Sequence, residues 1–299
     1  MPKNKSIDSI MLDGNFCSEQ ILKELRTWIK QLLLNGIRLP SLTVFLIGDN
    51  DASKIYVQKK IQACNSLGIQ CNLKQFSNNI KIEEILSEID YCNTDQNTDG
   101  ILVQLPLPSH LSTLEICSRI SPSKDIDGFN PQNVGRLALR SPQLRPCTPK
   151  GVMALLDFYK ISPESKHAVV VGVSNLVGRP LALELLLKGA TVTCCHRLTN
   201  KLEEHVKKAD LLCVATGKRN IIDCEWIPRQ CTVIDIGINR DSSGKIVGDL
   251  DQEKLVGNVY AYTPVPGGIG PMTVTMVLVN TLEAHSTHLN LQFISPTST

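Results

Sequence analysis

The segment HAVVVGVSNLVGRPLALELLLKGATVTCCHR, His167–Arg197, indicates how the second half of the chain folds. Its first apolar run, Ala168–Val171, is typical of a buried strand. A glycine turn follows, then a helix expected over about Val177–Lys188 and a second strand over Ala190–Cys195. This order of strand, turn, helix and strand predicts two parallel strands joined by a crossover helix.

The glycine turn carries a ligand-binding pattern. Gly172, Ser174 and Gly178 form G-x-S-x-x-x-G, a relative of the dinucleotide motif G-x-G-x-x-G. With a strand before it and a helix after it, such a turn lets a pyrophosphate approach backbone N–H groups at the positive end of the helix. The alternative interpretation is a tight turn without a ligand.

The end of the next strand indicates which dinucleotide would bind. An NAD site normally has Asp or Glu there, to hydrogen-bond the 2′-hydroxyl of the ribose. This chain has Arg197 instead. Because a guanidinium group suits a 2′-phosphate, the sequence favours NADP over NAD.

The same alternation continues on both sides of this segment. Towards the C-terminus, strands are expected in residues 209–217 and 231–239, and a helix that starts at Pro271. Upstream, strands are expected at Ser41–Gly48 and within 69–76 and 100–108, with helices within 52–67 and 81–92. The chain turns irregular between Asp125 and Pro149, which indicates a domain boundary.

The sequence therefore predicts two α/β domains, the second a Rossmann-like doubly wound parallel sheet, with the active-site cleft between them. We expect a catalytic domain in residues 1–147 together with a C-terminal helix at 271–288, and a nucleotide-binding domain in 148–270. Residues 289–299 lack a helical period and are expected to form a flexible tail.

Composition narrows the class of protein. The 299 residues are 42% hydrophobic and 20% charged, and a net charge of +2 gives no field that would draw nucleic acid or an anionic membrane. We find neither a transmembrane run nor a signal peptide. Eleven cysteines without a C-x-x-C pair argue against zinc and disulfides and for reduced thiols in a cytoplasm. A thiol nucleophile stays open, although no cysteine has a local catalytic signature.

One lysine of the helix expected within 52–67 lies on its apolar face, where a surface lysine is not expected. At about 100° per residue, Lys54 and Lys59 fall on the polar arc, whereas Lys60 lies in the middle of the apolar arc beside Ser53. It could snorkel past its neighbours to solvent, or it could be placed for chemistry.

Other polar or glycine-rich features would be unusual as structure alone. Gln104 ends a strand, and Asp125 and Asp127 follow in the loop KDIDG. The segment TPVPGGIGPMT, Thr263–Thr273, contains three glycines and three prolines, as expected where backbone must approach a flat ligand. Each feature could be a cap or a turn, but together with Lys60 they indicate a cleft between the domains.

Eight segments, in order, resemble the motifs of the methylenetetrahydrofolate dehydrogenase/cyclohydrolase family, especially its bacterial bifunctional form. The resemblance covers about Met11 to His285 and implies two reactions in one-carbon metabolism and purine biosynthesis. NADP⁺ takes a hydride from 5,10-methylenetetrahydrofolate, and water opens the methenyl product to 10-formyltetrahydrofolate. The segments are ASKIYVQKK, GILVQLPLP, KDIDGFN, PCTPKG, VVVGVSNLVGRP, VTCCHR, VIDIGIN and TPVPGGIGPMT.

The resemblance also implies roles for single residues. Lys60 matches the catalytic lysine, Gln104 its hydrogen-bond partner, and Tyr56 the tyrosine that stacks on the folate. Asp127 matches the carboxylate that holds the pterin ring. The substrate positions are Tyr56, Val103, Gln104, Leu105, Asp127, Pro266, Gly267, Gly268, Gly270 and Pro271, and the cofactor positions are Gly172, Val173, Ser174, Arg197 and Ile238.

Animal members of the family carry Arg where this chain has Val173, so a 2′-phosphate here would depend more on Arg197. The resemblance further implies a homodimer. Neither reaction requires a metal, and the sequence contains no ligand cluster for one.

Three alternatives remain at this point. A monofunctional dehydrogenase of the same family would have lost the cyclohydrolase step, although Tyr56, Lys60 and Gln104 are all present. A second alternative is another two-domain NADP enzyme, resembling shikimate dehydrogenase. The third is a non-catalytic NADP-binding protein, because a fold does not fix a function.

Overall fold

The computed structural model describes residues 8–297, and the chain divides into two compact units. The three-stranded unit consists of Gln20–Cys147 and the chain from Val274 onward. The six-stranded unit consists of Thr148–Thr273 and the chain up to Glu19. Two long helices, α1 (Gly14–Leu34) and α10 (Ile269–His288), contribute residues to both units.

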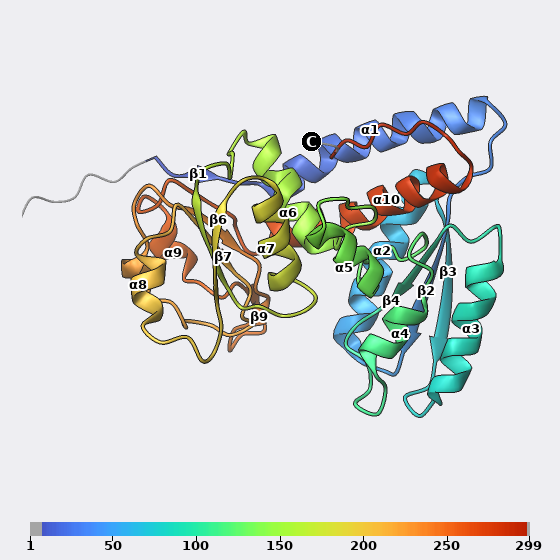
Figure 1. The fold of residues 1–299 in the computed structure, drawn as a ribbon, viewed down its shortest axis with the longest axis horizontal. Helices are drawn as coiled ribbons and strands as arrows, with labels where there is room; N and C mark the ends of the chain where they lie inside the picture. Colours follow the sequence, from blue (N-terminus) through green and yellow to red (C-terminus); the bar gives the residue numbers. More distant parts are fainter. Residues whose placement is uncertain (1–7, 298–299) are drawn as a thin grey trace, which may run out of the picture. The chain divides into compact units, whose positions relative to one another are not determined.

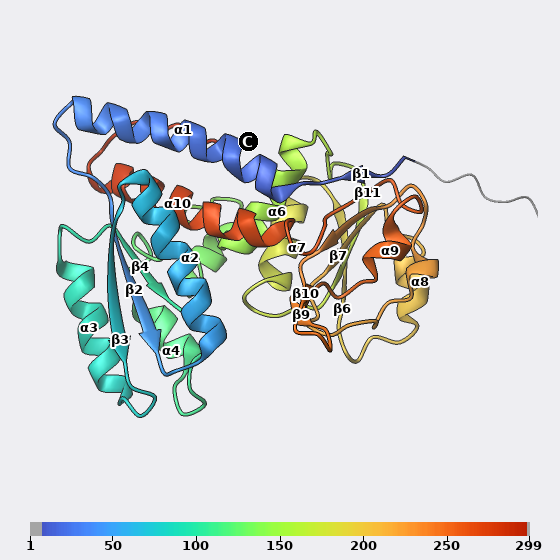
Figure 2. The same cartoon turned by 180° about the vertical axis from the view of Figure 1, so that it is seen from behind.

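The three-stranded unit is built on a parallel sheet with strand order β3-β2-β4 (Figure 1). Helix α4 lies on one face and α2 on the other, as Figures 1 and 2 show from opposite sides. On the α4 face, Phe45 and Ile101 of the sheet form a core with Ile85 of α3 and Ile116 of α4. The elements are β2 (Ser41–Ile47), α2 (Asp51–Leu67), β3 (Gln70–Phe76), α3 (Ile82–Thr94), β4 (Gly100–Val103), α4 (Thr113–Arg119) and α5 (Pro131–Ala138).

The six-stranded unit has a wholly parallel sheet in the order β1-β11-β8-β7-β5-β6. Strand β5 has β6 on one side and β7 on the other, so the strand order reverses there. In such sheets, ligands bind at the carboxyl ends of the strands beside this reversal. The strands are β1 (Ile10–Met11), β5 (His167–Val171), β6 (Thr191–Cys195), β7 (Leu211–Val214), β8 (Thr232–Asp235) and β11 (Ala261–Tyr262).

Helices and a short hairpin complete this unit. Val206 of α8 and Leu255 of α9 pack on one core with Val169, Leu212 and Val233 of the sheet. The remaining elements are α6 (Cys147–Phe158), α7 (Gly178–Leu187), α8 (Leu202–Val206), η1 (Cys224–Trp226), β9 (Asn239–Arg240), β10 (Ile246–Val247) and α9 (Gln252–Leu255). The two α/β units and the doubly wound parallel sheet confirm the expected fold class.

The described N-terminal residues belong with the six-stranded unit, whereas the sequence grouped them with residues 20–147. The reason is backbone pairing across the chain: the N–H of Ile10 donates to the carbonyl of Tyr260 over 2.9 Å, and that of Leu12 donates to Tyr262 over 2.8 Å. These bonds make β1 the edge strand of the sheet.

Three other expectations need correction. The segment expected to be irregular contains α5, in which Pro131 occupies the first turn and Asn130 caps the helix. Helix α10 begins at Ile269, two residues before Pro271. Residues 289–297 are not a loose tail: the ring of Phe293 lies 5.2 Å from that of Trp28, and Arg145 donates to the carbonyl of Thr297. The last two residues of the expected tail lie outside the described residues.

Among residues 8–297, the structure has no helix that is both long enough and apolar enough to span a bilayer.

Candidate functional site

Helix α2 directs Lys60 inward. The helix begins where the Asn50 side chain accepts the N–H of Ser53 over 3.0 Å, and it ends at Gly68, whose φ of 77° suits a left-handed cap. Its buried residues recur every three or four positions and include Lys60, which is only 7% exposed. The lysine therefore lies on the buried side of the helix, as its position in the apolar arc predicted.

Lys60 donates from Nζ to Oε1 of Gln104 over 3.1 Å. The amide of Gln104 is itself fixed, because its Nε2 donates to the carbonyl of Leu105 over 2.7 Å. That bond turns the oxygen of the amide towards the lysine. By contrast, Lys54 pairs with exposed Asp49, and Nζ of Lys59 lies 6.0 Å from the ring of Tyr56.

The two aspartates of the KDIDG loop have different surroundings. Asp125 is 1% exposed and accepts hydrogen bonds from the N–H of Asn130 over 2.7 Å and from Nδ2 of Asn133 over 2.9 Å. Burial raises the pKa of this carboxyl group to about 6. These bonds hold the turn and the start of α5, so Asp125 has a structural role in the loop.

Asp127 stays partly exposed and close to Lys60. Burial raises the pKa of Asp127, while the charge of Lys60 and a hydrogen bond from the Cys147 thiol act in the opposite direction. The structure thus brings Lys60, Gln104 and Asp127 together in the three-stranded unit. The cysteine is a neighbour that the sequence did not single out, because thiols carry no local signal for such a contact.

The other substrate positions of this unit border these groups. Tyr56 lies one turn before Lys60 on α2 and is partly exposed. Val103 is the last, buried residue of β4, and Leu105 follows Gln104 with a partly exposed side chain.

In the six-stranded unit, the glycine turn lies at the carboxyl end of β5. Gly172 has a φ of 97°, and a Cβ there would lie 2.3 Å from the carbonyl oxygen of Ala215. A Cβ on Gly178 would lie 1.8 Å from the carbonyl oxygen of Gly172. Both positions therefore require glycine, and the turn is packed against the residues that follow β7.

The remaining cofactor positions surround this turn. Ser174 is exposed, and its Oγ accepts the N–H of Val177 over 3.1 Å. The carbonyl of Val173 accepts a bond from Nε of Arg179 over 3.2 Å. Arg197 is exposed in the turn after β6, and Ile238 is 48% exposed after β8.

The glycine-rich segment 263–273 belongs to the six-stranded unit. The carbonyl of Gly267 accepts the N–H of Gly14 over 2.8 Å, and a Cβ on Gly14 would lie 1.8 Å from the carbonyl oxygen of Gly268. Part of the glycine content therefore serves the packing of the loop on the start of α1. Pro266 and Gly270 are exposed, and Pro271 is partly exposed inside α10.

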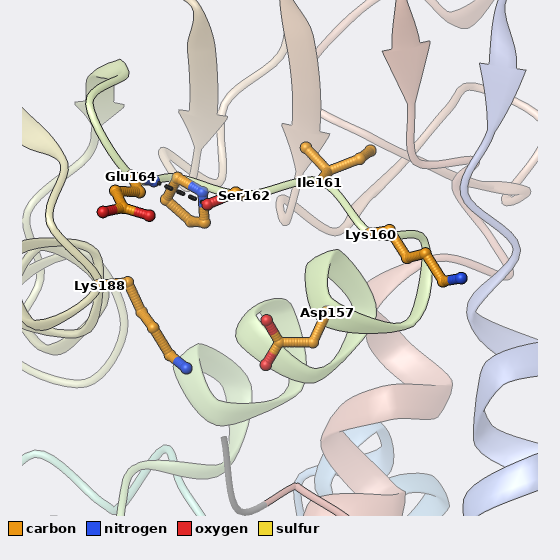
Figure 3. A pocket seen from close by; sticks show the side chains of 7 residues that line it. Asp157, Lys160, Ile161, Ser162, Glu164 and Lys188 are labelled. Atoms are coloured by element: carbon orange, nitrogen blue, oxygen red, sulfur yellow. Dashed lines mark hydrogen bonds between the residues drawn. The ribbon is translucent and has the colours of Figure 1, made fainter.

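A surface pocket of about 330 Å³ lies elsewhere in the six-stranded unit (Figure 3). The segment from Lys160 to Glu164 lines it, together with Asp157 of α6 and Lys188 after α7. Because this segment leads into β5, the pocket lies at the amino end of that strand, whereas the glycine turn lies at its carboxyl end. Its lining residues include none of the expected site positions.

Comparison with known families gives two matches along the chain. Residues 12–127 match the model of the tetrahydrofolate dehydrogenase/cyclohydrolase catalytic domain. Residues 146–289 match the model of the NAD(P)-binding domain of the same family.

Solved structures agree with this assignment. A bifunctional FolD methylenetetrahydrofolate dehydrogenase/cyclohydrolase from Campylobacter jejuni is 45% identical, with a TM-score of 0.91 over 93% of this chain and 99% of that one. The Trypanosoma brucei methylenetetrahydrofolate dehydrogenase-cyclohydrolase, solved with NADP cofactor and inhibitor, is 32% identical, with a TM-score of 0.90 over 95% of this chain and 99% of that one.

A chorismate mutase/shikimate 5-dehydrogenase fusion protein from Clostridium acetobutylicum shares the fold alone. It is 13% identical, with a TM-score of 0.51 over 86% of this chain and 94% of that one.

Proposed function

Because the chain belongs to the tetrahydrofolate dehydrogenase/cyclohydrolase family, we infer that it catalyses both reactions of the bifunctional enzymes. It oxidises 5,10-methylenetetrahydrofolate with NADP⁺ to the methenyl compound, which it then hydrolyses to 10-formyltetrahydrofolate. The observation that carries this function is the Lys60–Gln104 hydrogen bond of 3.1 Å within a chain that matches both domains of the family.

We propose that the six-stranded unit, which contains the expected nucleotide-binding domain of residues 148–270, binds NADP⁺, which accepts the hydride. The residues fit a dinucleotide: the glycine turn leads from β5 into α7, and Val177, the N-cap residue of α7, makes no side-chain bond that would cap the helix. Arg197 supplies a guanidinium for the 2′-phosphate, and Val173 and Ile238 supply apolar contacts. Hydride transfer needs orientation rather than a protein acid or base, so this unit acts by positioning.

We propose that the three-stranded unit binds the folate and carries the hydrolytic chemistry. Attack of water on the methenyl carbon benefits from a group that orients or deprotonates the water. Lys60 is that group, and Gln104 holds its amine in place. The geometry is compatible with either role, because a hydrogen bond to Gln104 restricts the amine in both protonation states.

Asp127 and Tyr56 are proposed to bind the substrate. A carboxylate can accept two parallel N–H bonds from the amino-pyrimidine edge of a pterin. The ring of Tyr56, one helical turn before Lys60, offers a flat apolar face for stacking. The exposed part of segment 263–273 is proposed to contact the substrate through Pro266, Gly270 and Pro271.

The test is an absorbance assay for methenyltetrahydrofolate, with NADP⁺ and 5,10-methylenetetrahydrofolate as reactants. We expect formation of the methenyl compound and its decay to 10-formyltetrahydrofolate. Formation without decay would identify a monofunctional dehydrogenase. Neither reaction, in a protein that still binds NADP⁺, would identify a non-catalytic binding protein.

We further propose that the protein is a cytoplasmic homodimer. The 11 cysteines all lie among the described residues and form no disulfide, which suits a reducing cytoplasm. The family resemblance supports a homodimer, which light scattering on the purified protein would test.

A further inference from the structure

Two buried carboxylates lie near the carboxyl end of the six-stranded sheet, outside the residues assigned above. Asp235 is the last residue of β8, and Asp249 lies in the loop between β10 and α9. Each is only 1% exposed. A buried carboxylate is stable only when donors surround it, so its bonds show which segments it joins.

Asp249 joins two loops that follow neighbouring strands. Its Oδ2 accepts the N–H of Thr216 over 2.7 Å, the hydroxyl of Thr216 over 2.8 Å and the N–H of Gly217 over 3.0 Å. Its Oδ1 accepts Nδ2 of Asn239 over 2.8 Å. One carboxylate thus holds the loop after β7 to the loop after β8.

Asp235 fixes Asp249 in turn. Its side chain accepts the N–H of Asp249 over 3.0 Å and that of Leu250 over 2.9 Å. A Cβ on Gly237 would lie 2.0 Å from the carboxylate of Asp249, and one on Gly248 would lie 2.0 Å from that of Asp235. The two glycines therefore let each carboxylate approach the backbone of the other segment. Burial raises the pKa of Asp235 to about 6, and the charge of Asp249 adds to this.

The loop that Asp249 holds also shapes the glycine turn. A Cβ on Gly172 would lie 2.3 Å from the carbonyl oxygen of Ala215 and 3.0 Å from the N–H nitrogen of Thr216. On the other side, Asn239 directly follows Ile238, a proposed cofactor contact. Asp249 therefore bonds to residues that lie next to two parts of the proposed dinucleotide site. Thr216 follows Ala215, which packs on Gly172, and Asn239 follows Ile238.

We propose that Asp249 is a positioning residue for NADP⁺, which fixes the loops after β7 and β8 in the arrangement that the dinucleotide requires. The inference rests on the proposed function. It predicts that a change at this residue weakens cofactor binding although its side chain is buried behind the loops.

The first experiment is Asp249→Asn in the full chain, with NADP⁺ affinity measured by titration calorimetry. An amide has only one oxygen, so its NH2 group faces either the donors of Thr216 and Gly217 or Nδ2 of Asn239, and a buried donor loses its acceptor. We expect the Kd for NADP⁺ to rise about tenfold or more. The KM for NADP⁺ should rise with it, while the cyclohydrolase step, assayed without NADP⁺, should change less than about threefold.

The matched control is Asp241→Asn. Asp241 also accepts several local bonds, from the N–H and hydroxyl of Ser243 and the N–H of Lys245, but it does so in the exposed β9–β10 hairpin. Its substitution should leave the Kd for NADP⁺ unchanged. Because Asp249→Asn could destabilise the unit, Thr216→Val serves as a second variant. It removes the hydroxyl bond to the carboxylate together with the bonds of that hydroxyl to Lys218 in the same loop, with an expected rise of about threefold to tenfold.

The outcomes separate the two proposals. If the wild-type protein does not bind NADP⁺, the proposed function fails. If the wild type binds NADP⁺ but both variants bind it equally well, the positioning role is overturned. It is also overturned if both variants lose NADP⁺ binding and cyclohydrolase activity in proportion to a lower Tm, because a purely structural role predicts that result.

Discussion

The two units differ in what builds their proposed sites at the carboxyl ends of parallel strands. One unit uses side chains, and the other uses backbone turns. In the three-stranded unit, the groups are side chains: Lys60 and Gln104 meet at 3.1 Å, and Asp127 lies close by. In the six-stranded unit the proposed site is a backbone turn at Gly172, packed against the loop after β7, and Asp249 holds that loop through its N–H groups.

This difference separates chemistry from positioning. A proton can be moved or a water molecule held by a side-chain amine, so the unit with Lys60 suits hydrolysis. Backbone N–H groups bind phosphates at fixed positions and do not titrate, so the other unit suits a cofactor that supplies its own chemistry. Variants of the three-stranded unit should therefore impair hydrolysis more than NADP⁺ binding, and variants of the six-stranded unit should do the reverse.

The largest effect is expected for Lys60→Met. Loss of the amine should lower cyclohydrolase activity by at least about a hundredfold, since positioned acid–base groups contribute rates of this order. Dehydrogenase activity should fall less, because hydride transfer needs no protein base. The two steps are assayed separately on folded protein.

Lys59→Met provides the matched control, because Lys59 is exposed on the same helix. It should change neither activity by more than a few-fold. Full cyclohydrolase activity in Lys60→Met would contradict the side-chain role of the three-stranded unit.

The next effect concerns the one side chain on which the six-stranded unit is proposed to rely for selectivity. Arg197→Ala should weaken NADP⁺ by about one to two orders of magnitude, because hydrogen bonds to charged groups contribute about 1.5–3 kcal/mol. NAD⁺ lacks the 2′-phosphate, so its affinity should change little. Titrations with both cofactors measure the difference, and equal losses would exclude Arg197 as the phosphate ligand. Arg179, which bonds to the carbonyl of Val173, is the next candidate.

Asp127→Asn should have a smaller effect, on the folate side only. The amide can accept one N–H bond where the carboxylate accepts two, so folate binding should weaken by about tenfold. Both activities should fall while NADP⁺ affinity stays unchanged, which titration of the two ligands would show. Asp125→Asn is expected to lower stability instead, because Asp125 accepts bonds from Asn130 and Asn133. If the variant at Asp125 impaired folate binding more, Asp127 would be the wrong carboxylate.

The smallest effect is a pH dependence of stability that distinguishes two buried carboxylates, Asp99 of the three-stranded unit and Asp235 of the six-stranded unit. Burial alone would raise the pKa of Asp99, but bonds from Arg38, His288 and the N–H of Ser41 outweigh it and hold the pKa at about 2. Asp235, bonded by backbone N–H groups, instead has a pKa raised to about 6.

The two pKa shifts change the free energy of unfolding with pH in opposite directions. Asp99, with a pKa of about 3.9 in the unfolded chain, stabilises the protein above that pH, and the contribution of about 2 kcal/mol is lost as the pH falls towards 2. The raised pKa of Asp235 means that its contribution weakens as the pH rises from about 4 to 6. Asp99→Asn should therefore reduce the fall in Tm between pH 4 and pH 2. If the fall in Tm between pH 4 and pH 2 were unchanged in this variant, the Arg38–Asp99 pair would contribute little to stability.

The sequence by itself determined the features that depend on neighbouring residues. The run of β-branched residues gave β5, and the glycine pattern gave the turn at Gly172. Helical periodicity placed Lys60 on the buried face of α2, where the structure has it 7% exposed. These succeed because backbone geometry and side-chain direction repeat over a few residues.

Only the tertiary structure decided the contacts between residues far apart in the chain. It paired β1 with β11, packed Phe293 on Trp28, and directed Gly267 and Gly268 to the start of α1. It also buried Asp249 behind loops that follow two other strands. No local pattern encodes these contacts, because a hydrogen bond or a packing contact depends on which segments the folded sheet brings together, and an aspartate before a short helix looks the same in sequence whether it caps that helix or joins two distant loops.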